Sequence, residues 1–196
     1  MRYRHALLFL GLAVAFGACA YGYKRAAEAA ASPLSVRAQE EDTRLKAELK
    51  ATLAVDESYS SLILTADVFM ARGFVVGFVD NLQQAAAIET AARSVRGLRS
   101  LQTYLPTRPA SDSTASDLEI KGKIKASIVE SAYELVPTRY TIEVLDGVVV
   151  LLGVTETAGE RDNVGQIATG TSGVKEVKNM LLVVEEGYGS IRPHLR

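Results

Sequence analysis

The stretch FVDNLQQAAAIETAARSVR occupies residues 78–96, and the stretch VTETAGERDNVGQIATGTS occupies residues 154–172. Each stretch holds 19 residues, lies between two glycines and follows an apolar run rich in β-branched side chains. A second apolar run follows each closing glycine. The bracketing glycines are Gly77, Gly97, Gly153 and Gly173. This repeated spacing indicates an internal duplication, which sets the number and size of the domains.

The second copy carries the clearer local signals. A helix is predicted to begin near Asp117, because isoleucines recur there at helical spacing. The run YTIEVLDGVVVLLG, residues 140–153, predicts a hairpin that turns at Asp146 and Gly147, since Asp-Gly favours the left-handed backbone of two-residue turns. A helix over 156–168 and a last strand complete the copy. The stripe of the first helix is Ile120, Ile124 and Ile128.

The first copy follows the same order with weaker signals. Asp42 and Thr43 are predicted to cap a helix of about three turns, whose buried side is Leu45, Leu49 and Leu53. Two strands are predicted to follow, with a turn at Gly73, and the next helix is predicted to end at Gly97, where glycine tolerates a left-handed backbone. The expected elements are strands at 61–69 and 74–78, a helix at 80–94 and a third strand closing at Leu105-Pro106.

Each copy therefore reads as helix, strand, strand, helix, strand, which predicts an α+β fold of two tandem small α-β-β-α-β domains. A tight hairpin makes antiparallel neighbours, whereas a crossover through a helix makes parallel ones, so each three-stranded sheet is expected to be mixed. The order of strands within each sheet stays open. The predicted division is a first domain at 42–106, a linker at 107–116, a second domain at 117–186 and a tail at 187–196.

The pattern of the N-terminal residues predicts export from the cytoplasm. Residues 1–20 begin with two arginines, continue through about a dozen apolar residues and end in small ones, as secretory signal peptides do. The apolar run is shorter than the ~20 residues that cross a bilayer as a helix. Residues 21–41 are rich in alanine without sustained apolar periodicity, and are predicted to be a flexible tether.

Two interpretations of Cys19 are open. In one, the bond before Cys19 is cut and the cysteine is acylated, although Phe16 stands where lipoproteins usually carry Leu, Val or Ile. In the other, Ala18-Cys19-Ala20 is an ordinary cleavage site and the cysteine is lost with the signal. Cys19 is the only cysteine of the chain, so no disulfide can form within it. By similarity to lipoproteins generally, Ala20 after the cysteine favours the outer membrane.

Three runs of sequence carry a resemblance to the BON domain family. They are LDGVVVLLGVT at 145–155, AARSVRGLRSLQTYL at 91–105 and IATGTSGVKEVKNMLLV at 167–183. One spacing departs from the family's pattern. Gly147 and Gly153 are six residues apart, whereas Gly73 and Gly77 are four apart, so the family's turn glycine falls on Ala71. The first hairpin is therefore expected to be shortened or its turn displaced.

With the signal in front, the chain resembles the dual-BON-domain lipoproteins of the outer membrane. The resemblance implies a non-enzymatic protein of the periplasmic face that maintains envelope integrity, anchored through Cys19, or alternatively a soluble periplasmic one. It also implies contact with anionic phospholipid around the first helix of the second domain, residues 117–132. The alternative is an adaptor for an envelope protein partner, such as a division or outer-membrane assembly protein, without lipid recognition.

The residues of that helix leave the lipid contact open. The candidate lipid-binding residues are Leu118, Lys121, Lys123 and Lys125. Lys121 and Lys125 are neighbours at helical spacing and can face phosphates, but a charge run of this kind is equally typical of a solvated helix face. Residues 117–186 carry seven basic and twelve acidic side chains, a net charge near −5 that repels an anionic surface except at a local patch.

The sequence offers little for catalysis. The two histidines, His5 and His194, lie in the signal and the tail, and a single cysteine provides no zinc spacing. The run GTSGVK lacks the ending of a phosphate-binding loop and follows a helix, so it is interpreted as a helix cap. Neither domain is basic overall, which argues against nucleic-acid binding. We therefore predict no enzyme activity, no metal and no cofactor.

Overall fold

The computed structural model describes residues 34, 36–55, 59, 62–111, 113–131 and 140–184. The predicted signal peptide with Cys19, the tether up to residue 33 and the tail at 187–196 lie outside these residues. Pro33–Arg196 forms one compact unit. Within the described part of the chain, no helix has both the length and the apolar character needed to cross a membrane.

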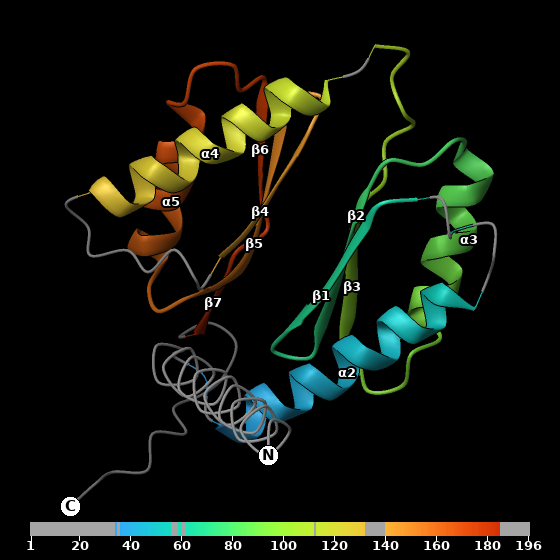
Figure 1. Ribbon diagram of the computed structural model, residues 1–196. Coiled ribbons are helices and arrows are strands. Elements are labelled where there is room, and N and C mark those ends of the chain that lie inside the picture. Colours follow the sequence, from blue (N-terminus) through green and yellow to red (C-terminus); the bar gives the residue numbers. More distant parts are fainter. Residues whose placement is uncertain are drawn as a thin grey trace, which may run out of the picture. The chain divides into compact units, whose positions relative to one another are not determined.

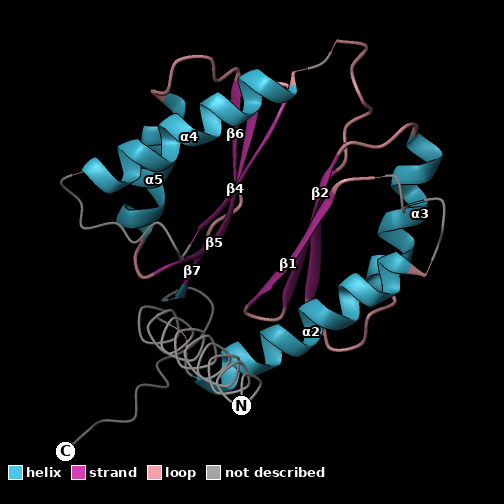
Figure 2. Cartoon of the chain, in the orientation of Figure 1, coloured by secondary structure: helices cyan, strands magenta, loops and turns pink. Residues whose placement is uncertain are grey.

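The two copies have the same order of elements (Figures 1 and 2). The first contains helix α2 (Val36–Ala54), strands β1 (Leu64–Phe69) and β2 (Arg72–Gly77), helix α3 (Leu82–Arg93) and strand β3 (Ser100–Tyr104). The second contains α4 (Thr114–Glu130), β4 (Tyr140–Leu145), β5 (Val148–Thr155), α5 (Ala158–Thr169), β6 (Glu176–Asn179) and β7 (Leu182–Val183). The predicted α+β fold is confirmed.

Both sheets are mixed, as predicted. Strand β2 is central in the first sheet, antiparallel to β1 and parallel to β3, and β5 is central in the second, antiparallel to β4 and parallel to β6. The last strand is split, which the sequence did not predict. Met180 N donates to Leu151 O at 2.9 Å, and the Asn179 side chain accepts from Leu181 N, before β7 resumes the pairing with β5.

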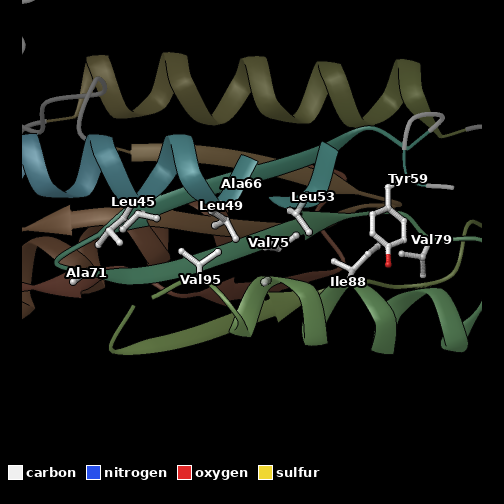
Figure 3. Close-up of a cluster of buried hydrophobic side chains, with 12 residues drawn as sticks. Leu45, Leu49, Leu53, Tyr59, Ala66, Ala71, Val75, Val79, Ile88 and Val95 are labelled. Atoms are coloured by element: carbon white, nitrogen blue, oxygen red, sulfur yellow. The ribbon is translucent and has the colours of Figure 1, made fainter. Parts of the chain in front are cut away.

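The first helix of each repeat covers its sheet through the predicted apolar stripe. Leu45, Leu49 and Leu53 of α2 pack with Ile88 and Ala92 of α3 in the core of the first repeat (Figure 3). In the second repeat the corresponding core contains Ile120, Ile124, Ile128, Val164 and Ala168. The two stripes recur at the same spacing because each first helix meets the same surface of its own repeat.

Two predicted helix starts are wrong. Helix α2 begins at Val36, within the predicted tether, and α4 begins at Thr114, within the predicted linker. Asp42 was expected at a start because aspartate favours caps, and Asp117 because it precedes the isoleucine stripe, but both lie inside their helices and are buried. Their carboxylates find hydrogen-bond donors elsewhere in the fold, so the helices can extend beyond them.

Each buried aspartate binds the hairpin turn of its own repeat. Asp42 accepts hydrogen bonds from Met70 N at 2.8 Å and Ala71 N at 2.7 Å. Asp117 accepts from the amides of Asp146 and Gly147, both at 2.8 Å. A carboxylate can accept both donors at once, and hydrogen bonds to charged groups are the stronger ones. The first helix of each repeat is thereby fixed to its hairpin.

The first hairpin turns at Met70 and Ala71, so the predicted turn at Gly73 is wrong. Leu64 pairs with Gly77 as Tyr140 pairs with Gly153, which gives the two hairpins equal length. Gly73 lies within β2. Met70 and Ala71 have positive φ values of 54° and 57°, where non-glycine residues are strained. The hydrogen bonds to Asp42 hold this backbone without the turn glycine that the second repeat provides.

The pKa of Asp42 predicts a pH dependence of stability. Burial raises the pKa of this carboxyl above its ordinary value of 3.8, against the hydrogen bonds from Ala71 and Met70, which lower it. The folded state then holds the proton more tightly than the unfolded state. Relative to Asp42→Asn, the free energy of unfolding of the wild type should fall as the pH rises from about 3.8 through the raised pKa.

Urea denaturation of both proteins over roughly pH 3–7 measures this slope. The variant also loses a hydrogen bond, which lowers its free energy of unfolding by the same amount at every pH. The slope of the difference against pH therefore still reports the pKa of Asp42. If the wild type instead becomes more stable relative to Asp42→Asn as the pH rises, the pKa of Asp42 is not raised in the folded protein.

Gly77 marks a close approach between β2 and the start of β1. A Cβ atom there would lie 2.6 Å from Ile63 O and 2.8 Å from Leu64 Cδ2. Gly77→Ala should therefore lower the free energy of unfolding by about 2 kcal/mol, since one strand must move. Gly122→Ala is a control of opposite sign, because nothing lies within 4 Å of that position in α4. It should stabilise the protein by roughly 0.5–1 kcal/mol, measured by urea denaturation.

The sheet faces away from the helices form a third apolar cluster, which we call the interface cluster because both repeats contribute to it. Met70, Phe74 and Val76 come from the first repeat, and Val150, Leu152, Val154 and Leu182 come from the second. Polar pairs accompany it. Thr65 Oγ1 donates to Glu143 Oε1 at 3.1 Å, and Thr141 Oγ1 donates to Asp67 Oδ2 at 3.3 Å. Strand β5 is consequently buried on both faces.

Candidate functional site

Helix α4 has a buried side and a markedly exposed one. Its isoleucine stripe lies in the core, whereas Leu118 and Val129 are 68% and 69% exposed. Residues 118, 122, 125 and 129 follow helical spacing and share one side of α4. We call Leu118, Gly122, Lys125 and Val129 the outer stripe of α4. It places one lysine between two exposed apolar side chains, with open space over the glycine.

The three candidate lysines have different surroundings. Lys121 is half-buried and its Nζ lies 3.0 Å from Glu143 Oε2 of β4. Lys123 Nζ lies 2.7 Å from Glu119 Oε1, and this hydrogen bond lowers the pKa of the Glu119 carboxyl. Lys125 is exposed and has no ion-pair partner among the described residues. Only Lys125 therefore offers its full charge to an approaching anion.

The structure brings together two of the four candidates and adds one that sequence analysis missed. Leu118 and Lys125 lie on the outer stripe, whereas Lys121 turns toward β4 and Lys123 pairs on another side of the helix. Val129 completes the stripe. Its spacing of seven and eleven residues from Gly122 and Leu118 was the signal that could have revealed it, because these positions fall on one helical face.

A groove of about 510 Å³ adjoins α4, between the first repeat, the following connection and the second repeat. Its apolar lining includes Ile63, Val76, Phe78, Leu118, Val144 and Leu145. Its charged and hydroxyl-bearing lining includes Thr65, Arg108, Ser111, Asp117, Lys121 and Glu143. The volume is in the range of roughly 300–1,000 Å³ that small-molecule sites occupy.

Backbone pairing positions Arg108 at this groove. Arg108 N donates to Val79 O at 2.8 Å, and Val79 N donates to Pro106 O at 3.0 Å, so the connection leaves β3 alongside the end of β2. The guanidinium carbon lies 5.7 Å from the ring centroid of Phe78, a cation–π contact. Arg108 is exposed and has no acidic partner in the described part of the chain.

No group of three or more His, Cys, Asp or Glu side chains in the described residues is arranged to hold a metal ion. The buried carboxylates of Asp42 and Asp117 are occupied by turn amides. Among the described residues, the site offers a surface and a groove with apolar contact area, one exposed lysine without an ion pair and one exposed arginine.

Comparison with known proteins identifies the family. The model of the BON domain matches residues 116–185, which span the second repeat from α4 to β7. The chain is 30% identical over 146 residues to Osmotically-inducible protein Y of Escherichia coli (strain K12), with 72% of each chain covered. The chain belongs to the BON-domain family. The resemblance found in the sequence is confirmed at this level, and membership of the dual-BON outer-membrane lipoproteins stays a prediction.

The chain is also similar to two solved structures at low identity. Two matches are structures of CdsD, the structural protein of the type III secretion system of Chlamydia trachomatis, one of them of its C-terminal domain. Each match has 15% identity and a TM-score of 0.29 and covers 72% of this chain. The matched part is 66% of the C-terminal-domain structure and 63% of the other structure.

Proposed function

We propose that this BON-domain protein is a non-enzymatic envelope protein at the periplasmic face of the outer membrane, which docks on anionic phospholipid through the outer stripe of α4. The observation that carries the proposal is the exposure of Leu118 and Val129 on either side of Lys125, on a helix whose opposite side is buried. Such an arrangement gives an interfacial helix both apolar and electrostatic contact with a lipid surface.

The expected free energies indicate that insertion of apolar side chains, rather than charge, contributes most to membrane binding. A basic residue near an anionic membrane contributes about 1 kcal/mol, whereas fully burying a leucine or valine side chain contributes about 1.5–3 kcal/mol. The second repeat is acidic overall, so the long-range field opposes binding. The outer stripe overcomes this field only at short range, which predicts binding that depends on anionic lipid and on both apolar side chains.

An anchor at Cys19 supports this weak contact. If the cysteine is acylated, the tether holds the BON repeats near the membrane and makes docking an intramolecular step at high effective concentration. A face that binds weakly by itself is then sufficient. A protein that lacks its N-terminal segment should therefore bind membranes with modest affinity.

Co-sedimentation of Pro33–Arg196 with vesicles tests the docking face, because this compact unit retains all described helices and strands. Leu118→Ser with Val129→Ser should lose most binding to vesicles containing anionic lipid, and Lys125→Glu should reduce it most at low salt, where screening is weakest. Lys123→Gln is the matched control, since Lys123 already pairs with Glu119. Equal binding by all variants would refute the assignment of the stripe.

Lys121 is unsuitable for a charge-reversal test. Its ammonium group pairs with Glu143, which also accepts from Thr65, so a glutamate at position 121 would place two carboxylates together between the repeats. Any loss of binding would then include damage to the fold. Substitution at Lys125 avoids this ambiguity because its side chain is exposed.

The alternative function is an adaptor for an envelope protein partner. The observation that favours it is the pairing of Lys121 and Lys123 with acidic side chains, which removes two of three lysines from lipid recognition. The same outer stripe would then pack against a protein surface. Failure of the wild type to bind any vesicle, with folding intact, would favour this function.

A further inference from the structure

We propose that the groove between the two BON repeats binds one single-chain anionic amphiphile in monomeric form, such as a fatty carboxylate. Its head would meet the Arg108 guanidinium, and its chain would lie against the apolar lining contributed by both repeats. This binding site goes beyond the proposed docking of α4, which uses only the outer stripe.

The apolar lining accounts for the chain. Ile63 is 86% exposed and Leu118 is 68% exposed, and these two side chains line the same groove from different repeats. Large exposed apolar side chains gathered at one concavity are typical of a binding site, whereas single scattered ones are not. Val76, Phe78, Val144 and Leu145 extend this lining within the volume of about 510 Å³.

The charges of the lining account for the acidic head. Lys121 and Glu143 neutralise each other at 3.0 Å, and Glu143 also accepts from Thr65. The Asp117 carboxylate is committed to the two amides of its hairpin turn. Arg108 is thus the one charged side chain of the lining that has neither an ion pair nor a hydrogen bond to its charged group among the described residues. Its several N–H donors suit a carboxylate, which can accept two of them in parallel.

The location of Arg108 favours a ligand with a single anionic end. Its guanidinium packs on Phe78, an aromatic ring of the same lining, so the charge lies directly beside apolar surface. A ligand that joins an anionic head to an apolar chain complements this arrangement. A cationic amphiphile with the same chain would meet the like charge of Arg108 and lose affinity.

Titration of Pro33–Arg196 with laurate below its micellar concentration tests the proposal, with isothermal calorimetry and amide NMR shifts as readouts. Laurate should bind with one-to-one stoichiometry and shift the amides of Val76, Gly77 and Glu143. Dodecyltrimethylammonium, which has a chain of the same length with a cationic head, should bind more weakly, and acetate should not bind.

Three variants give the expected changes in affinity. Arg108→Gln should weaken laurate binding by about tenfold, the effect of losing one charged hydrogen bond. Ile63→Glu should weaken it further, and its exposed position predicts an intact fold. The matched control is Arg96→Gln, since Arg96 is an exposed arginine outside the groove lining.

A further variant separates the groove from the docking face. Val129→Ser should bind laurate as the wild type does while losing vesicle binding, because Val129 is not part of the groove lining. The proposal is overturned if laurate does not saturate, if the cationic amphiphile binds as tightly as laurate, or if Arg108→Gln binds laurate as the wild type does. None of these outcomes depends on whether α4 docks on vesicles.

Discussion

Replacing Asp117 by alanine should lower the free energy of unfolding by roughly 3 kcal/mol, because each buried donor left unsatisfied costs about 1–3 kcal/mol. The variant leaves the amides of Asp146 and Gly147 without the carboxylate that accepts both at 2.8 Å. It also frees the start of α4 from the hairpin of its repeat. Urea denaturation followed by circular dichroism measures the loss.

Hydrogen exchange distinguishes this account from general destabilisation. In Asp117→Ala, the amides of Asp146 and Gly147 should lose protection before the amides of α5 do. Asp80→Ala is the control, since Asp80 is exposed and its carboxylate has no hydrogen bond or ion pair in the described structure. If Asp117→Ala is as stable as the control, the carboxylate does not hold the hairpin.

Replacing Phe74 by alanine should lower the free energy of unfolding by about 4 kcal/mol, which is within the range observed when a buried phenylalanine is truncated to alanine. Phe74 is fully buried in the interface cluster, where its ring centroid lies 6.0 Å from that of Phe69. Because this cluster joins β2 to residues of β5, the substitution should destabilise the second repeat as well as the first.

NMR spectra of Phe74→Ala test the joining of the repeats. The amides of Val150 and Leu152 should shift, although they lie in the other repeat. Ile88→Ala is the matched core variant, since Ile88 is equally buried but belongs to the core of the first repeat alone. If the chemical shifts of the β5 amides do not change in Phe74→Ala, the interface cluster does not join the two repeats.

The regular elements were predictable because their patterns are local. The isoleucines of α4 and the leucines of α2 recur at helical spacing, and an Asp-Gly turn specifies its hairpin without tertiary information. The turn at Met70 and Ala71 was not predictable in this way. Neither residue favours positive φ, and the group that holds them, Asp42, lies 28 residues from Met70.

The candidate site was partly predictable for the same reason. Leu118 and Lys125 follow from helical spacing, but the neutralisation of Lys121 depends on Glu143, which lies 22 residues further along the chain. The groove depends on the approach of two sheets through the interface cluster. The unbroken apolar run VVVLLGV at 148–154 indicates that both faces of β5 are apolar, because successive side chains of a strand point to opposite faces, but it does not indicate which surface covers the second face.

Paramagnetic relaxation from spin-labelled anionic lipid tests the central claim most directly. Amide NMR spectra of Pro33–Arg196 are recorded with small bicelles that carry the labelled lipid. If the protein docks through the outer stripe, signal loss should centre on Leu118, Gly122, Lys125 and Val129, and should spare α2 and α5. Signal loss centred on another element, or none at any position, would contradict docking through the outer stripe of α4.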